Sequence, residues 1–451
     1  MEKNNSRTDF GSRFGVLVAM AGSAVGLGNM WRFPYLVGEN GGAAFIIIYI
    51  VCVILVGIPI LCSEFIIGRR AKSDAIGSYK KLAPGSKWWL VGLMSVIASG
   101  FVISFYSVVG GWSVKYLVEA CTFSFTTGNF GNPADAFSSF VTSPWQPLMY
   151  DLIFLAATAV IIILGVKQGI EKFSKIMMPL LFVIVLLIVV RSVTLPGSSD
   201  GLKYLFSPDF SKITSRTILA ALGQAFFSLS LGCGTILTYA SYVKKDENVF
   251  KCSYMTAGAD TLFALIAACA IMPAVFAFGI TPGQGPGLVF VTLPHIFEKL
   301  PLGGIIAILF FLALFIAAIT SSISLLEVVI AAMIEQMKVS RKKAVVIATT
   351  VIFSLSILCS LSQGVLGNFK LFGFNLFDLF DYISANILMT LGALFVVLFV
   401  GWKLGKSRIK DELSNGGNIR IPKWLFNTLY AIIRYLAPIV IIIIFLAGIL
   451  S

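Results

Sequence analysis

Several glycines, an amide and a guanidinium lie close together in one apolar stretch near the start of the chain, residues 20–34. Each glycine lowers helix stability by roughly 1 kcal/mol relative to alanine, so a helix that only crossed lipid would not contain several. Peptide groups released from helical hydrogen bonding persist inside a bilayer only where protein buries them or where they line a cavity. The stretch therefore predicts a broken membrane helix whose free peptide groups hold a polar species. The residues concerned are Gly22, Gly26, Gly28, Asn29 and Arg32.

A second interruption occurs in a later apolar segment, where Ser228 and Ser230 precede the Gly-Cys-Gly sequence at 232–234. The two interruptions are separated by an odd number of predicted spans, so the two halves of the chain have opposite orientations. Paired breaks in inverted repeats indicate the binding site of a secondary transporter. The alternative is two independent faces of small residues that let helices pack closely. Hydroxyls beside both glycine pairs favour the binding site.

The elements that must position these residues follow from composition. Of the 451 residues, 58% are hydrophobic and 12% are charged, which is typical of an all-α polytopic membrane protein. The apolar runs are each near or above the roughly 20 residues that a spanning helix needs. Eleven spans are expected, at about 14–37, 42–68, 88–120, 147–166, 174–193, 217–241, 252–279, 302–336, 343–362, 376–402 and 424–450.

The net charge of +13 is distributed between alternate loops. Lys and Arg are frequent in 1–13, 69–87 and 403–423, and sparse in 122–146 and 363–375. The positive-inside rule then places the amino terminus in the cytoplasm and, after eleven spans, the carboxyl terminus outside. The excess charge is explained by topology and by attraction to anionic lipid, so no nucleic-acid partner is expected. The first apolar run is too long for a cleavable signal peptide, and a multi-pass protein of the plasma (inner) membrane is expected.

The chain offers little for metal or covalent chemistry. Its seven cysteines show no paired spacing, and a single histidine leaves no basis for a histidine metal site. No nucleotide-binding loop and no nucleophile–base pair is evident, so an enzyme and an organic cofactor are not expected. An ion gradient is then the expected source of energy.

Four motifs carry a resemblance to a known family. The segments GSAVGLGNMWRFPYLVGENGGAAF (22–45), GQAFFSLSLGCGTILTYASYV (223–243), GPGLVFVTLP (285–294) and AAITSSIS (317–324) are similar to the neurotransmitter:sodium symporter family, in its bacterial amino-acid transporter branch with eleven helices. The resemblance implies a five-plus-five inverted-repeat transporter fold with unwound helices 1 and 6, plus an eleventh helix. The expected divisions are a cytoplasmic tail (1–13), a first repeat (14–193), an extracellular loop (194–216), a second repeat (217–402), a cytoplasmic loop (403–423) and a last helix (424–451).

The resemblance also implies two sodium sites. Sodium is a hard cation that takes oxygen ligands, and the carboxyl ends of half-helices supply carbonyls with partial negative charge. Spacing agrees with this at the second site, because Ala317, Thr320 and Ser321 share one helical face. Hydroxyls that bond back to their own helix are the alternative there. The first site is expected to use Ala24, Asn29, Ser228 and Asp260, and the second Gly22, Val25, Ala317, Thr320 and Ser321.

Asp260 departs from the best-known amino-acid transporters of the family, which have an amide there. A carboxylate in the middle of a span is costly and is expected to be functional, with a cation as its partner. Chloride-dependent relatives balance the cation with a bound anion, for which Tyr49 and Gln224 are at the matching positions. We therefore expect transport that depends on sodium but not on chloride.

The substrate is expected to be a neutral hydrophobic L-amino acid, aliphatic or aromatic. Peptide N–H groups at the start of the second half of span 1 form an anion site for its carboxylate, with the Tyr106 hydroxyl beside them. Relatives that carry plain amines have an aspartate where this chain has Gly26. The expected lining is Ser23, Ala24, Gly26, Leu27, Gly28, Val102, Tyr106, Phe227, Ser228, Ser230, Cys233, Ser321 and Leu325.

Charged pairs are expected to act as gates. Arg32 and Asp381 match an outer pair, and Arg7 and Glu335 match an inner pair with Tyr242 beside it. Exposed ion pairs contribute less than about 1 kcal/mol, which suits contacts that break in every cycle. A receptor or a channel on the same scaffold is the alternative function. The chain shows neither an appended signalling domain nor a ring of carboxylates, and no obligatory protein partner is evident.

Overall fold

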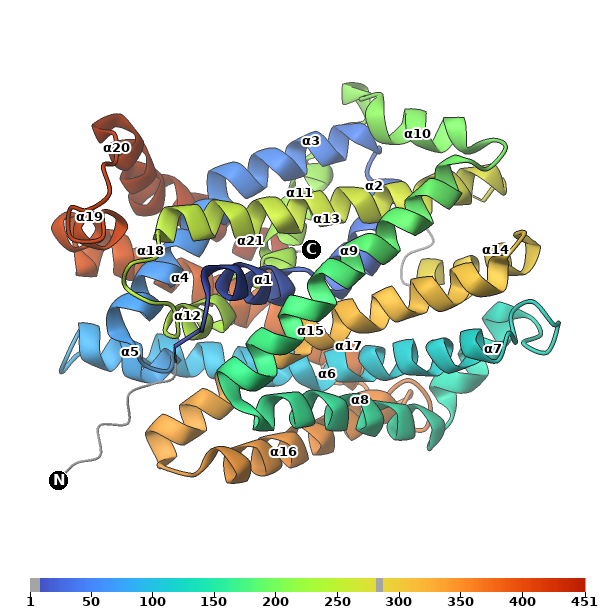
Figure 1. Ribbon diagram of the computed structural model, residues 1–451, viewed down its shortest axis with the longest axis horizontal. Coiled ribbons are helices and arrows are strands. Elements are labelled where there is room, and N and C mark those ends of the chain that lie inside the picture. The colour runs from blue at the N-terminus through green and yellow to red at the C-terminus, as the bar shows by residue number, and fades with distance from the viewer. Residues whose placement is uncertain (1–8, 281–286, 451) are drawn as a thin grey trace.

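The computed structural model describes residues 9–280 and 287–450 (Figure 1). In that part of the chain all regular structure is helical except for an isolated β-bridge between Leu371 and Phe374. Several spans contain a wider π-helical turn, a feature that commonly marks functional sites. The label η denotes these turns and also the single 3₁₀ turn η4.

The first half contains α1 Arg13–Ala24, η1 Gly28–Arg32, α2 Phe33–Glu39, α3 Ala43–Cys52, η2 Val53–Gly57, α4 Ile58–Ala71, α5 Ala75–Leu82, α6 Trp89–Cys121, α7 Pro133–Thr142, α8 Gln146–Ile163, η3 Val166–Glu171 and α9 Lys172–Val193. The second half contains α10 Ser198–Phe206, η4 Phe210–Lys212, α11 Ser215–Ser228, α12 Thr235–Ala240, α13 Val249–Ala277, η5 Leu288–Thr292, α14 Leu293–Lys299, α15 Gly303–Met337 and α16 Arg341–Leu361. The remainder is α17 Leu376–Tyr382, η6 Ile383–Met389, α18 Thr390–Leu398, η7 Phe399–Leu404, α19 Lys406–Leu413, α20 Lys423–Ala431, η8 Ile432–Leu436 and α21 Ala437–Leu450.

Within the described residues, nine helices are long and apolar enough to cross a membrane. A tenth span results if α1 and the helix Gly28–Glu39, which meet at a bend of 51°, are counted together. The remaining predicted span, 217–241, is divided between α11 and α12 by the residues 229–234. Counting these halves as one broken span gives the eleven that hydropathy predicts.

The two broken spans lie in the interior of the bundle. Helix α1 packs against α9, α13 and α15, and appears near the centre of Figure 1. The long helices α6 and α15 pack against each other. The loop 122–146 contains α7, a helix that was not expected there. Its local signals are Asn132, whose side chain accepts from the Ala134 N–H at 2.9 Å, and Pro133 in the first turn.

The break in span 6 consists of left-handed backbone. Ser230, Gly232 and Gly234 have φ values of 51°, 80° and 79°, respectively. The fully buried Glu64 carboxylate accepts from the Gly232 N–H at 2.7 Å and from the Leu237 N–H at 3.3 Å. Glu64 therefore bonds the freed backbone of span 6 from span 2. Its side chain supplies the hydrogen bonds that an unbroken helix would have supplied.

We predict that Gly232→Ala destabilises the folded protein. A Cβ atom at this position would lie 2.0 Å from the Met389 carbonyl oxygen, and the positive φ disfavours an L side chain. The expected loss is more than about 1 kcal/mol and is measured as a fall in Tm in detergent. Gly258→Ala is the matched control, since its Cβ would meet nothing within 4 Å. Equal Tm values for the two variants would contradict the prediction.

Candidate functional site

The break in span 1 frees both carbonyl oxygens, which carry partial negative charge, and N–H groups, which carry partial positive charge. Helix α1 ends at Ala24, and Val25 has the extended values φ −70° and ψ 108°. The last four carbonyls of a helix have no partner within it, so the carboxyl end of α1 presents oxygen atoms to the break. On the other side, the Leu27 N–H donates to the Tyr106 hydroxyl at 3.2 Å. Tyr106 therefore lies where its predicted role requires.

Asn29 joins the broken spans to α13. Its amide nitrogen donates to the Asp260 carboxylate at 2.7 Å, to the Asp260 carbonyl at 3.1 Å and to the Ser228 hydroxyl at 3.0 Å. Its amide oxygen accepts from the Gly26 N–H at 2.9 Å. Three residues predicted for the first sodium site are thus in direct contact, and the fourth, Ala24, lines the adjoining cavity.

The Asp260 carboxylate has only neutral partners in the described part of the chain. Ser228 donates to both of its oxygens, at 2.9 and 2.8 Å, and the Tyr49 hydroxyl donates at 3.2 Å. Within residues 9–280 and 287–450, no lysine or arginine forms an ion pair with it, and its side chain is fully buried. A buried carboxylate without a cationic side chain is a strong indication of a bound cation.

The residues predicted for the second sodium site also lie together. The Ser321 hydroxyl donates to the Val25 carbonyl at 3.3 Å, which joins α15 to the end of α1. A Cβ atom on Gly22 would lie 3.5 Å from that of Thr320. The Thr320 hydroxyl donates to the Ala317 carbonyl at 3.0 Å, so in this structure its hydrogen bonds back to its own helix. The Thr320 oxygen keeps lone pairs that can bind a cation while this hydrogen bond is made.

A cavity of about 30 Å³ lies between the two breaks and α6, α15 and η6. Every residue predicted to contact substrate lines it except Ser23, whose carbonyl accepts from the Ser230 and Ser321 hydroxyls at 3.4 Å. Met389 of η6 also lines the cavity and was not among the predicted lining residues. The complete lining is Ala24, Gly26, Leu27, Gly28, Val102, Tyr106, Phe227, Ser228, Ser230, Cys233, Ser321, Leu325 and Met389.

Arg32 and Asp381 are the two residues of the predicted outer gate. The Arg32 guanidinium lies 4.7 Å from the centroid of the Phe227 ring, so the cation covers a residue of the cavity. Arg32 and Asp381 interact electrostatically, but these two described residues form no ion pair of 4.0 Å or less. Their direct pairing therefore stays a prediction.

For the predicted inner gate, Arg7 lies outside the described residues, so its pairing with Glu335 stays a prediction. Glu335 accepts from the Ser73 hydroxyl at 2.5 Å and from the Asp74 N–H at 3.0 Å. The Tyr242 hydroxyl donates to Glu327 at 2.8 Å.

Glu327 was not identified from sequence, although a carboxylate inside the apolar run 302–336 was a signal of the same kind as Asp260. Glu327 is fully buried and forms a two-pronged ion pair with Arg341, whose second nitrogen lies 3.2 Å from it. This pair ties α15 to the start of α16.

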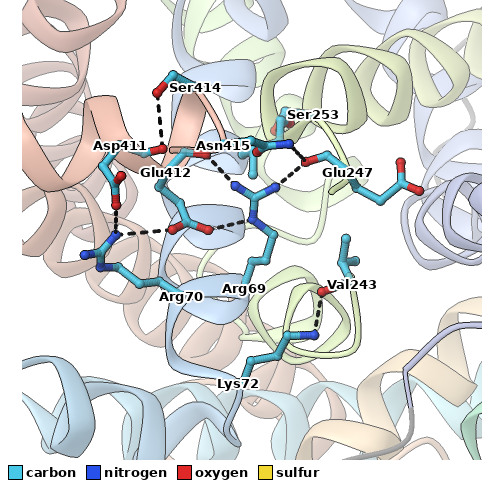
Figure 2. A network of polar contacts seen from close by, with 11 residues as sticks. Arg69, Arg70, Lys72, Val243, Glu247, Ser253, Asp411, Glu412, Ser414 and Asn415 are labelled. Carbon is cyan, nitrogen blue, oxygen red and sulfur yellow. Dashed lines mark hydrogen bonds and ion pairs between the residues drawn. The ribbon is translucent and has the colours of Figure 1, made fainter. Parts of the chain in front are cut away.

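Figure 2 shows a buried cation, Arg69, at the end of α4. Arg69 is 1% exposed and donates to the Glu412 side chain at 2.6 Å, to the Glu412 carbonyl and to the Glu247 carbonyl. Arg70 lies 2.9 Å from Asp411. The network joins the end of span 2 to the loop after span 6 and to α19. Removing one partner of a buried pair typically costs about 3–5 kcal/mol, so these contacts hold the three segments together.

The profile of the "Sodium:neurotransmitter symporter family" matches residues 7–136 and 141–451. The chain is 42% identical over 442 residues to the uncharacterized sodium-dependent transporter YhdH of Bacillus subtilis, covering 98% of each protein. It is 38% identical to an uncharacterized sodium-dependent transporter of Haemophilus influenzae, covering 99% of each. The crystal structure of MhsT in complex with L-phenylalanine matches with a TM-score of 0.90 and 44% identity, over 98% of this chain and 100% of that one.

We predict a pH-dependent stability that originates at Asp74, which caps α5 in the loop after α4. Burial, and then the neighbouring Glu335 carboxylate, raise the pKa of Asp74 from 3.8 to about 6. The folded protein therefore holds this proton more strongly than the unfolded chain. The resulting stability is complete below the unfolded value and is lost as the pH rises through about 6.

Lowering the pH from about 7 to about 5 is expected to raise the free energy of unfolding by about 1 kcal/mol through this group. Asp74→Asn keeps an oxygen that caps α5, at the position that accepts from Gly77 and Gln336, and should remove this contribution. The measurement is Tm in detergent against pH for both proteins. Identical pH profiles would show that Asp74 is not the source.

Proposed function

The chain belongs to the sodium:neurotransmitter symporter family, and from this premise we propose that it imports a neutral hydrophobic L-amino acid together with sodium by alternating access. Members of this family are transporters and not enzymes. The observation that carries the proposal is the buried Asp260 carboxylate, which neutral donors from three other spans surround. A bound Na⁺ supplies the positive charge that this part of the chain does not.

Two sodium ions fit the oxygen atoms that the site brings together. The first would take the Ala24 carbonyl, the Asn29 and Asp260 side chains and the Ser228 oxygens. The second would take the Gly22 and Val25 carbonyls with the Ala317 carbonyl and the hydroxyls of Thr320 and Ser321. All of these donors are oxygen, as a hard cation prefers. No organic cofactor is required for transport of this kind.

The two charged ends of the substrate zwitterion match the two kinds of free peptide group, N–H for the carboxylate and carbonyl for the ammonium group. The carboxylate of the substrate would lie near Gly26–Gly28 beside the Tyr106 hydroxyl, where the first turn of a helix favours an anion. The N–H groups of Leu27 and Gly28 would receive it, because the Gly26 N–H is bonded to Asn29. The ammonium group of the substrate would meet the carbonyls of Ala24, Phe227 and Ser230. Gly26 supports an amino acid over a plain amine, because a carboxylate side chain there would add a fixed negative charge beside the substrate.

The side chain of the substrate would point toward the apolar part of the lining, formed by Val102, Phe227, Cys233 and Leu325. MhsT is described in complex with L-phenylalanine, which supports a hydrophobic amino acid as the substrate class. Cys233 is small, and the room beside it suits a large aliphatic or aromatic group.

Alternating access would use the contacts on the two sides of the site. On the outer side Arg32 stacks on Phe227, with Asp381 as the partner that it would engage on closure. On the inner side Arg7, Glu335 and Tyr242 would close the cytoplasmic path. The protein would lie in the plasma (inner) membrane with its amino terminus in the cytoplasm and its carboxyl terminus outside, as the loop charges indicate.

A channel or an amino-acid-sensing receptor on this scaffold remains the second candidate, and uptake distinguishes it. We predict that purified protein in proteoliposomes accumulates radiolabelled L-phenylalanine when sodium is higher outside, saturably and against its gradient. Hydrophobic amino acids should compete, and aspartate and lysine should not. Replacing sodium by potassium should abolish accumulation. Equilibration without accumulation would indicate a channel, and binding without uptake would indicate a receptor.

We further predict that uptake is unchanged when chloride is replaced by gluconate, because Asp260 provides the negative charge that balances sodium. Asp260→Asn removes this charge while keeping a similar shape, and should lower uptake more than about 10-fold without chloride. Chloride should restore part of it if Tyr49 and Gln224 then hold the anion. Asp135→Asn, an exposed change on α7, is the control. Strong loss of wild-type uptake in gluconate would overturn the prediction.

A further inference from the structure

Met389 is the one lining residue of the cavity that comes from span 10. It lies at the end of the π-helical turn η6 and is 4% exposed. Its carbonyl is pressed against the break in span 6, since a Cβ atom on Gly232 would lie 2.0 Å from the Met389 oxygen. In the other direction, a Cβ atom on Gly392 would lie 2.4 Å from the Gly232 carbonyl oxygen. The backbone at Met389 is therefore fixed at the level of the substrate site.

The volume of the cavity requires a lining side chain to move. About 30 Å³ is available, whereas an engineered cavity that binds benzene measures about 150 Å³. An aliphatic or aromatic side chain of a substrate cannot enter unless the lining gives way on one side.

The other side chains around the cavity are held in place. The Tyr106 hydroxyl accepts from the Leu27 N–H, Phe227 lies under the Arg32 guanidinium, and the Cys233 thiol donates to the Ser230 carbonyl at 2.9 Å. Valine and leucine, the remaining apolar types, are branched and have few rotamers. Methionine is unbranched, has three rotatable bonds and fills irregular gaps.

We propose that Met389 is the movable wall of the substrate pocket and sets the largest apolar side chain that the transporter accepts. Its side chain changes rotamer and leaves the cavity when a large substrate binds. When a small substrate binds, the thioether fills the cavity. The space gained lies beside Cys233, whose small side chain leaves room in that direction. This inference rests on the proposed function and concerns its specificity.

The test is competition against tritiated L-phenylalanine uptake by L-valine, L-leucine and L-tryptophan in proteoliposomes, for the wild type and three variants. Met389→Ala should raise the inhibition by tryptophan relative to valine about 10-fold or more, because a hydrophobic pocket discriminates by at least this factor per methylene group. Met389→Phe should reverse the preference. Met389→Leu has a similar volume but a branched side chain, and should weaken tryptophan without weakening valine.

Leu388→Ala is the matched control, because Leu388 lies on the same turn and does not line the cavity. It should leave the order of the competitors unchanged. The sodium concentration for half-maximal uptake should stay the same in all variants, which a general disturbance of the site would alter. If one variant fails to fold, the other two still decide.

The same order of competitors in the folded Met389 variants as in the wild type would overturn the role of Met389. So would an equal change of order in Leu388→Ala. Absence of sodium-driven uptake of any amino acid by the wild type would instead overturn the proposed function, so the two failures are distinct.

Discussion

The structure depends on one constraint, that every peptide group freed inside a bilayer needs a polar partner. The helices of two spans are interrupted locally, and a buried side chain bonds part of the backbone freed at each interruption. In the first break, the Asn29 side chain accepts from the Gly26 N–H of the same span. In the second, the Glu64 side chain from span 2 accepts from the Gly232 N–H. Groups that these side chains do not reach are available to a ligand. The same hydrogen bonds that stabilise the fold thereby define the binding site.

Two buried carboxylates beside the breaks differ in how their charge is compensated. Glu64 and Asp260 are both fully buried carboxylates, but their surroundings differ. Glu64 accepts from backbone N–H groups at the positive end of a half-helix, whereas Asp260 accepts from an amide and two hydroxyls. The first is compensated within the fold and acts as support. The second has donors that can be reoriented, which is the property expected of a residue that exchanges a side-chain partner for an ion.

Sequence predicted the parts of this structure that depend on local pattern. Hydropathy gave the spans, and the paired glycines located the breaks at Gly26–Gly28 and at 232–234. The cluster of Asn29, Ser228 and Asp260 followed from the resemblance, because spacing alone does not bring together residues more than 200 positions apart. Residues whose role depends on a distant element were missed. Arg69 bonds Glu412 across 343 positions, and nothing in either loop indicates that pairing. Met389 reads as one more apolar residue in an apolar span.

In the proposed orientation and transport cycle, the ion pairs on the two sides of the site differ, as a site that faces two sides in turn requires. Towards the cytoplasm, Arg69 and Arg341 are bound by carboxylates that are nearly or fully buried, so separating these segments exposes charge and is costly. Towards the outside, the Arg32 guanidinium rests on an aromatic ring, a contact of roughly 0.5–2 kcal/mol. The outer side therefore opens at a lower free-energy cost than the inner side. Binding at Asn29 and Asp260 acts on spans 1, 6 and 7 together, and an ion there can change the balance between the two sides without touching either gate.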